Sequence, residues 1–195
     1  GLPFLALVAL ADGLNGYDPV RRWVGAYPFL GWGAVLAVLV GFMAAAPFLL
    51  SGRHAPWAAG AGLAMLVGLV DDVRVLSPIG KLLGQAAAAS VMVAGGLRFD
   101  LSGILALDAA LTLLWLVVIP NAFNVTDMMD GLAAGVGGIA GAGFAVALSL
   151  LGQAEPALLA AALSGGLCGF LMHNFHPARI FMGDTGSLFA GSVLG

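Results

Sequence analysis

The amino-acid sequence predicts an all-α fold: a polytopic helical integral membrane protein with about six complete transmembrane helices and partial ones at both ends. Hydrophobic residues make up 61% of the 195 residues and charged residues only 9%, which is far from the average of soluble domains. Several apolar stretches reach about twenty residues, the length that crosses the hydrocarbon core at about 1.5 Å per residue. The 30 glycines suit membrane helices, whose backbones approach closely where residues are small.

The predicted spans alternate with short connections. Helices are favoured over a strand barrel because residues 104–119 and 132–151 are apolar over helical lengths, whereas barrel strands are short and alternate in polarity. In chain order, connections at 51–55, 71–81, 98–103, 121–130 and 151–156 separate spans over residues 31–50, 55–71, 82–98, 103–120, 131–151 and 155–173. Neither a repeat nor a low-complexity linker divides residues 1–195, so we expect a single membrane-embedded domain.

Counting crossings places the connections 11–30, 71–81, 121–130 and 173–186 on one face of the membrane. That face carries five of the seven basic residues: Arg21, Arg22, Arg74, Lys81 and Arg179, against Arg53 and Arg98 on the other face. The positive-inside rule therefore makes it the cytoplasmic face. The net charge of −3 gives no basic surface for nucleic acid, and that class of partner is set aside.

Aspartates are the most informative residues of this apolar chain. A carboxylate at the bilayer centre costs roughly 2.5–3.5 kcal/mol, so such residues usually mark a site. Five of them lie on the predicted cytoplasmic face: Asp71, Asp72, Asp127, Asp130 and Asp184. Asp100 and Asp108 lie at or near the opposite face, and we interpret them as interfacial and isolated from other polar groups.

The first polar cluster is Asp71-Asp72 with Arg74 and Lys81. Two adjacent carboxylates beside two basic residues could hold a divalent cation, accept a proton or balance the basic charges. A solvated loop with local ion pairs is the alternative, and on this segment alone the two interpretations are about equal.

The second cluster contains Asn121, Asn124, Asp127 and Asp130, which recur every three residues. This spacing drifts around an α-helix by about 60° per step and lines up only on a tighter 3₁₀ turn, so the side chains form a fan or a ridge of oxygen ligands. Helix capping explains one such residue and not four. We therefore favour a functional interpretation.

The third cluster surrounds Asp184, with Gly183 and Gly186 on either side of a predicted tight turn. Such a turn at the start of a helix can offer N–H groups to a phosphate, and a simple loop-to-helix cap is the alternative. His173 and His176 suggest zinc, but tetrahedral zinc needs three or four defined N or S ligands, so this assignment is disfavoured.

Oxygen ligands from several carboxylates suit Mg²⁺, with Mn²⁺ as the alternative, and both ions commonly bridge substrate phosphates. Arg74, Lys81 and Arg179 on the same face could contact phosphate. The combination indicates phosphoryl-group chemistry at the cytoplasmic surface of a membrane. The competing hypothesis is an ion-coupled transporter, which predicts carboxylates in mid-span and on paired repeats. A CDP-alcohol phosphotransferase is disfavoured, because the expected Arg after Asp130-Gly131 is missing.

In order and sidedness the three clusters resemble the polyprenyl-phosphate N-acetylhexosamine-1-phosphate transferases of glycosyltransferase family 4, which are related to the phospho-MurNAc-pentapeptide translocase. The matching segments are residues 68–72, 81–85, 121–132 and 176–187. The resemblance implies one transferase domain over residues 1–195, which lacks the C-terminal part of the family. One departure is Met128-Met129, where the family usually has Gly-Leu.

The resemblance further implies the reaction and the roles of residues. A sugar 1-phosphate passes from a UDP-N-acetylhexosamine, with UDP-GlcNAc slightly preferred, to polyprenyl phosphate, and UMP is released. This step initiates a lipid-linked envelope glycan at the cytoplasmic face of a bacterial inner membrane, and a homodimer is left open. By resemblance, Asp184 is the metal ligand, and Asp71 and Asp72 are catalytic, acting on the lipid phosphate or the metal. The implied substrate-binding residues are Lys81, Asn121, Asn124, Asp127, Asp130, Asn174 and Arg179.

Overall fold

The computed structural model describes residues 54–195; the predicted span over residues 31–50 and the partial N-terminal span lie outside the described residues. This part of the chain is entirely helical, with no strand between residues 54 and 195, which confirms the predicted all-α class. Its helices are α4 (Ala55–Val73), α5 (Pro78–Ala94), α6 (Leu105–Thr126), α7 (Leu132–Leu150), α8 (Ala154–Asn174) and α9 (Gly183–Leu194).

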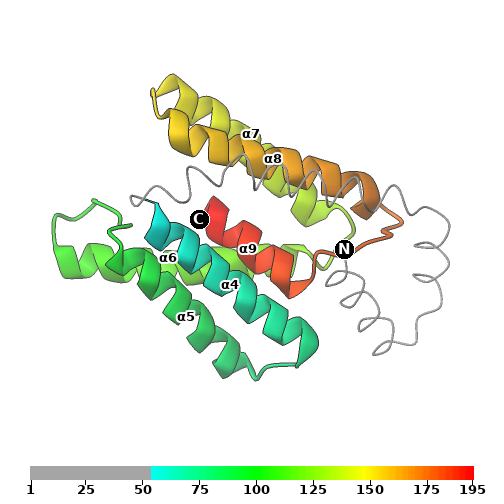
Figure 1. The fold of residues 1–195 in the computed structure, drawn as a ribbon, viewed down its shortest axis with the longest axis horizontal. Helices are drawn as coiled ribbons and strands as arrows, with labels where there is room; N and C mark the ends of the chain where they lie inside the picture. Colours follow the sequence, from blue (N-terminus) through cyan, green and yellow to red (C-terminus); the bar gives the residue numbers. More distant parts are fainter. Residues whose placement is uncertain (1–53) are drawn as a thin grey trace.

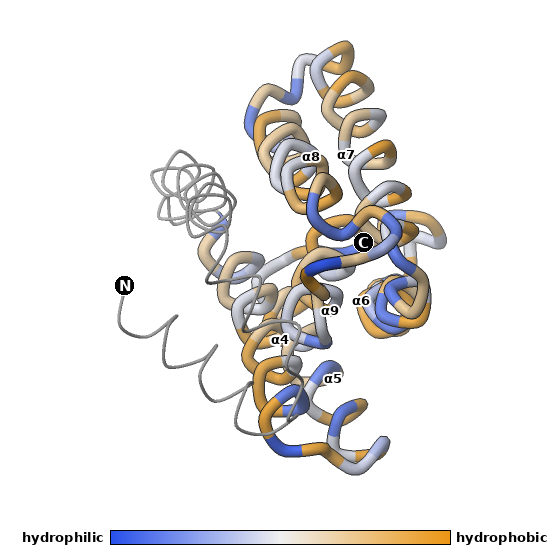
Figure 2. The backbone as a smooth tube through the Cα atoms, turned by 90° about the vertical axis from the view of Figure 1, so that its right-hand side faces the viewer, coloured by the Kyte–Doolittle hydropathy of each residue, from blue (hydrophilic) through white to orange (hydrophobic). Residues whose placement is uncertain are grey.

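Within the described residues, α4, α6, α7 and α8 are long and apolar enough to cross a membrane, and α5 is a shorter apolar helix. Large apolar side chains such as Leu114, Ile139 and Val146 stand exposed along the helices, which suits contact with lipid. Figure 2 shows the hydrophilic residues gathered mainly at the connections between helices. The chain is therefore a multi-pass helical membrane protein.

Two helices have boundaries that differ by four residues or more from the sequence-based expectation, and one of these boundaries is the end of α5 at Ala94 instead of residue 98. Helix α5 begins at Pro78 instead of residue 82, because Ser77 caps it: the Ser77 Oγ accepts a hydrogen bond from the Gly80 N–H at 3.1 Å. Helix α6 continues past Pro120 to Thr126 instead of ending at residue 120. Proline is tolerated inside membrane helices, and Pro120 is fully buried here.

The short helix α9 lies at the centre of the fold, between α4 and α6, while α7 and α8 form an antiparallel pair on its other side (Figure 1). One buried cluster joins α4, α5 and α6 around Met92 and Leu116, with Phe189 of α9 packed against it. A second joins α6, α7 and α8 around Phe123 and Leu167, and contains Ala190 of α9. Both hydrophobic clusters therefore include side chains of α9.

The connection between α5 and α6, at the end of the fold away from the aspartate clusters, corrects one expectation. The expectation that Asp108 is isolated from other polar groups is wrong: its side chain is buried, with 3% of its surface exposed. Its Oδ1 accepts hydrogen bonds from the Ser102 N–H at 3.0 Å and from the Ser102 hydroxyl at 2.7 Å. A carboxylate removed from solvent needs such donors, and the turn before α6 supplies them.

Candidate active site

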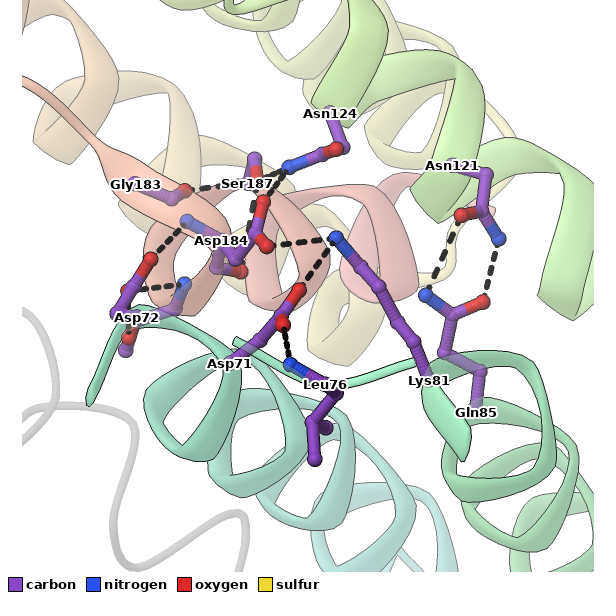
Figure 3. A network of polar contacts seen from close by, with 11 residues as sticks. Asp71, Asp72, Leu76, Lys81, Gln85, Asn121, Asn124, Gly183, Asp184 and Ser187 are labelled. Atoms are coloured by element: carbon purple, nitrogen blue, oxygen red, sulfur yellow. Dashed lines mark hydrogen bonds and ion pairs between the residues drawn. The ribbon is translucent and has the colours of Figure 1, made fainter. Parts of the chain in front are cut away.

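Three charged side chains from three different helices meet where α4 ends and where α5 and α9 begin. The Lys81 ammonium lies 3.0 Å from Asp71 Oδ2 and 2.6 Å from Asp184 Oδ2 (Figure 3). The side chains of Lys81, Asp71 and Asp184 are 17%, 11% and 23% exposed, so this ion bridge is largely withdrawn from water. We call these three residues the ionic cluster. Its two carboxylates share one cation, the Lys81 ammonium group.

The sequence around residues 71–81 explains how two members of the ionic cluster meet. The Leu76 N–H donates a hydrogen bond of 2.7 Å to Asp71 Oδ1, which closes the turn after α4. The cap by Ser77 then starts α5 early enough to place Lys81 in its first turn. A start at residue 82 would have left Lys81 outside the helix, so the local cap decides where its ammonium group lies.

The carboxylate of Asp184 is held from the α6 side as well. The Asn124 side-chain N–H₂ donates to Asp184 Oδ1 and, at 2.8 Å, to Ser187 Oγ. Ser187 is fully buried and donates in turn to the Gly183 carbonyl at 2.8 Å. Both oxygens of Asp184 thus have a donor, one charged and one neutral, and the orientation of the carboxylate is fixed.

Asp72 faces the backbone of α9 and not Lys81. Its Oδ1 accepts from the Asp184 N–H at 2.9 Å, and its Oδ2 accepts from the Thr185 N–H at 2.9 Å and from the Thr185 hydroxyl. The expectation that the N–H groups of this turn would be offered to a phosphate is therefore wrong for Asp184 and Thr185, because a carboxylate of α4 already accepts from both.

Asn121 lies on α6 one turn before Asn124 and pairs with α5. Its side-chain amide and that of Gln85, which is 2% exposed, donate hydrogen bonds to each other. The Asn121 N–H₂ also donates to the Val117 carbonyl at 2.7 Å. Figure 3 shows Asn121 facing Gln85, whereas Asn124 faces Asp184. In this structure Asn121 joins two helices beside the ionic cluster.

Asp127 follows the last residue of α6 and lies near the other carboxylates. Burial raises the pKa of Asp127 to about 6, and the negative charges of Asp184 and Asp72 add to the effect. Its environment therefore disfavours a charged carboxylate in the absence of a bound cation.

Asp130 and Asn174 connect the α6–α7 turn to the α8–α9 loop. Asp130 Oδ2 accepts from the Ala178 N–H at 3.0 Å and lies 2.9 Å from His176 Nδ1, and these contacts hold the pKa of Asp130 below its usual value. Asn174, 2% exposed, accepts from the Gly131 N–H at 3.0 Å and donates to the Ile180 carbonyl at 2.9 Å. Both side chains hold two loops together.

The four residues of the second cluster thus form a fan and not a ridge. Asn121 and Asn124 belong to an α-helix, Asp127 is its C-cap residue and Asp130 follows in a turn. The side chains of Asn121, Asn124 and Asp130 contact different partners. Arg179 is exposed on the α8–α9 loop, where its backbone N–H donates to the His173 carbonyl at 2.9 Å. The structure therefore gathers Asp71, Lys81, Asn124 and Asp184 directly, with Asp72 attached through the backbone of α9.

The donor set can be compared with what Mg²⁺ requires. Between residues 54 and 195 no group of three or more His, Cys, Asp or Glu side chains stands ready to enclose a metal. Asp71 and Asp184 do offer carboxylate oxygens side by side. Mg²⁺ commonly uses one or two carboxylates together with water and substrate phosphates, so these two residues fit such an ion and not an all-protein cage.

The sequence-based prediction assigned no role to Gly68 or Gln85, although both lie beside the ionic cluster. Both residues lie inside the segments that match the family. A polar residue one helical turn from a charged residue of the site is the sequence signal that could have indicated such a role. Gln85 is one turn after Lys81.

Comparison with known proteins adds the family. A family model described as glycosyl transferase family 4 matches residues 54–195. The phospho-N-acetylmuramoyl-pentapeptide-transferase of Synechococcus sp. is 43% identical over 156 residues, which cover 67% of this chain and 42% of the relative. The decaprenyl-phosphate N-acetylglucosaminephosphotransferase of Mycolicibacterium smegmatis is 40% identical over 153 residues, covering 69% and 38%. The probable undecaprenyl-phosphate N-acetylglucosaminyl 1-phosphate transferase of Bacillus subtilis is 37% identical over 168 residues, covering 80% and 47%.

The chain spans less than half the length of each of these three curated relatives. The matched region nevertheless contains all six described helices and the ionic cluster. The chain belongs to glycosyl transferase family 4.

Proposed function

We propose that the protein containing this chain transfers an N-acetylhexosamine 1-phosphate from a UDP-sugar to polyprenyl phosphate and releases UMP, in a Mg²⁺-dependent reaction. The observation that carries the proposal is the ionic cluster of Asp71, Lys81 and Asp184, built from three helix ends in a membrane protein of glycosyl transferase family 4. The names of the relatives support a polyprenyl-phosphate acceptor.

The reaction requires little covalent chemistry from the protein. An oxygen of the lipid phosphate attacks the phosphorus that carries the sugar, and the bond from this phosphorus to the UMP oxygen breaks, so UMP leaves with the electron pair. Catalysis of such a transfer rests on positioning and on charge stabilisation. A bound Mg²⁺ neutralises charge on the phosphates.

Individual residues of the chain would have different roles in this reaction. Asp184, oriented by Asn124, would hold the metal, with Asp71 beside it. Lys81 supplies a fixed positive charge for a phosphate next to these carboxylates. Arg179 would contact phosphate from the α8–α9 loop. The nucleotide-sugar side would involve Asp127, Asp130 and Asn174 at the ends of α6 and α8, together with Asn121 of α6.

We further propose that the site faces the cytoplasm from a bacterial inner membrane and that UDP-GlcNAc is the donor. The excess of Lys and Arg on the predicted cytoplasmic face supports this orientation. The relatives include transferases named for both GlcNAc and MurNAc-pentapeptide, so both donors belong in the test. The transporter hypothesis has no comparable support, because Asp71, Asp72 and Asp184 lie at helix ends and not in mid-span.

The test is the release of UMP by the full-length protein, purified in detergent, from UDP-GlcNAc or UDP-MurNAc-pentapeptide with added polyprenyl phosphate. Release that requires Mg²⁺ and the lipid phosphate is expected. Absence of UMP with every UDP-amino sugar tried would refute the transferase. Uptake of a solute into vesicles that depends on the aspartates would instead support a transporter.

A further inference from the structure

The two adjacent aspartates at the end of α4 have different partners, although the sequence suggests a pair with one role. Asp71 points one oxygen at Lys81 and the other at the Leu76 N–H. Asp72 directs both oxygens at the first turn of α9, where Asp184 and Thr185 donate their backbone N–H groups. Only Asp71 belongs to the ionic cluster.

The first turn of α9 needs an external cap. The first four N–H groups of a helix have no partner inside it, and Met182 at the N-cap position makes no side-chain cap. Asp72 accepts from two of these groups and also receives the Thr185 hydroxyl. A negative charge at this position also interacts favourably with the helix dipole. Asp72 thus caps α9 from a different helix.

The packing of α4 against α9 brings the cap within reach. Gly68 lies one turn before Asp72 on the same face of α4, and it touches the backbone of α9. A Cβ atom at Gly68 would lie 2.3 Å from the Asp184 carbonyl oxygen and 2.7 Å from the Thr185 Cα, closer than any side chain allows. On the α9 side, Gly183 has φ +64° and lies against the Asp72 carboxylate.

We propose that Asp72 is a positioning residue: it caps α9 and, together with the close contact at Gly68, fixes the backbone of Asp184, without itself contacting the lipid phosphate or a metal. This inference rests on the proposed function. It assigns adjacent aspartates to separate tasks, with the charge of Asp71 used in the ionic cluster and the acceptor oxygens of Asp72 used to hold a helix end.

Asparagine separates the two roles, because it caps helix N-termini about as well as aspartate but carries no charge. In the UMP-release assay, Asp72→Asn is expected to keep turnover within about tenfold, since one of the hydrogen bonds is lost. Asp72→Ala is expected to lose about 10²-fold or more, as misplacement of a reacting group by about 1 Å does. Asp71→Asn is the matched variant, and it should lose nearly as much turnover as Asp71→Ala.

Two further measurements distinguish positioning from chemistry. Asp72→Asn should keep the pH profile of turnover and the Mg²⁺ concentration for half-maximal rate, which the loss of a metal ligand or a base would change. Hydrogen exchange of the peptide that covers residues 183–187 should be about tenfold faster in Asp72→Ala and intermediate in Asp72→Asn, which keeps one of the two acceptor oxygens. Exchange needs no substrate, so it tests the cap even if the parent protein releases no UMP.

Gly68→Ala tests the contact itself, with Gly62→Ala as its control, since a Cβ at Gly62 meets nothing within 4 Å. Gly68→Ala should reduce turnover by about 10²-fold and Gly62→Ala should not. The inference fails if Asp72→Asn is as inactive as Asp72→Ala while its exchange is slower than that of Asp72→Ala, or if Gly68→Ala turns over like the parent. An inactive parent with the expected exchange pattern would count against the proposed function and leave the cap in place.

Discussion

Aspartates at the two ends of the helix bundle differ in the sequence distance and the charge of their partners. At one end Asp71 and Asp184 are joined through Lys81, and Asp184 lies 103 residues from that lysine in the sequence. At the other end Asp108 is satisfied by Ser102, only six residues away. Both arrangements remove carboxylates from lipid, but only the first brings together charges from three helices.

The contacts around Asp108 are local: they join the residues between α5 and α6 to the first turns of α6. Thr112 accepts from the Phe99 N–H at 2.8 Å and donates to the Asp108 carbonyl at 2.7 Å, while Phe99 packs edge-on against Trp115 with 5.9 Å between ring centroids. These contacts order the chain between α5 and α6. An aspartate in an apolar chain therefore marks a candidate site when its partners are distant in sequence and charged, and a turn when they are near and neutral.

The largest contrast is expected from removing one carboxylate at each end. Asp184→Asn should lower the rate of UMP release by about 10³-fold or more, because Asp184 is the proposed metal ligand and a catalytic metal ion contributes several kcal/mol of transition-state stabilisation. The matched variant Asp108→Asn should stay within about twofold of the parent. Parallel assays with both proteins folded in detergent make the comparison, and equal rates for Asp184→Asn and the parent would remove Asp184 from the site.

The second prediction concerns the shared cation. Lys81→Met leaves two largely buried carboxylates facing each other, and we expect a loss of about 2–3 kcal/mol in stability, below the range for fully buried pairs because all three side chains keep some exposure. Thermal unfolding in detergent measures the change, with the exposed Arg98→Met as control. Adding Asp71→Asn to Lys81→Met should recover part of the loss. An unchanged melting temperature in Lys81→Met would show that the bridge contributes nothing.

The third prediction concerns the turn at the opposite end. Asp108→Ala leaves the Ser102 N–H without its acceptor, and we expect a loss of about 1–2 kcal/mol in stability with turnover unchanged. Thermal unfolding and the UMP assay on the same preparation separate the two effects. A large loss of turnover at full stability would contradict the structural role of this end.

The smallest expected effect is a pH dependence from Asp127. Because its pKa is raised to about 6 in the folded protein, folding favours the protonated form, and stability from this group is lost as pH rises from about 4 to about 6. In metal-free buffer, the melting temperature should therefore fall less between pH 4.5 and pH 7.5 in Asp127→Asn than in the parent protein. The same pH dependence in both proteins would assign the change to other groups.

Much of the fold follows from apolar run lengths. The predicted spans 55–71, 131–151 and 155–173 match α4, α7 and α8 closely, because lipid imposes length and hydropathy together. The start of α5 and the end of α6 differ from the predicted bounds for local reasons: Ser77 caps α5 early, and a buried membrane helix accommodates Pro120.

The sequence predicts which residues form the candidate site, but it does not predict which of their side chains contact each other. Sidedness alone placed Asp71, Asp184 and Lys81 on one face, and the structure brings them into contact. The attachment of Asp72 to α9 and the pairing of Asn121 with Gln85 depend on how helices pack over separations of 112 and 36 residues. No local pattern contains that information.

The central place of α9 has a consequence for biogenesis. This helix completes both hydrophobic clusters and carries Asp184, yet it is synthesised after α4 to α8. Asp71 and Lys81 can pair as soon as α4 and α5 have inserted, but the second carboxylate arrives only when α9 packs between α4 and α6. The ionic cluster is therefore assembled late, and a nascent chain that stops before α9 carries the charges of a site without its geometry.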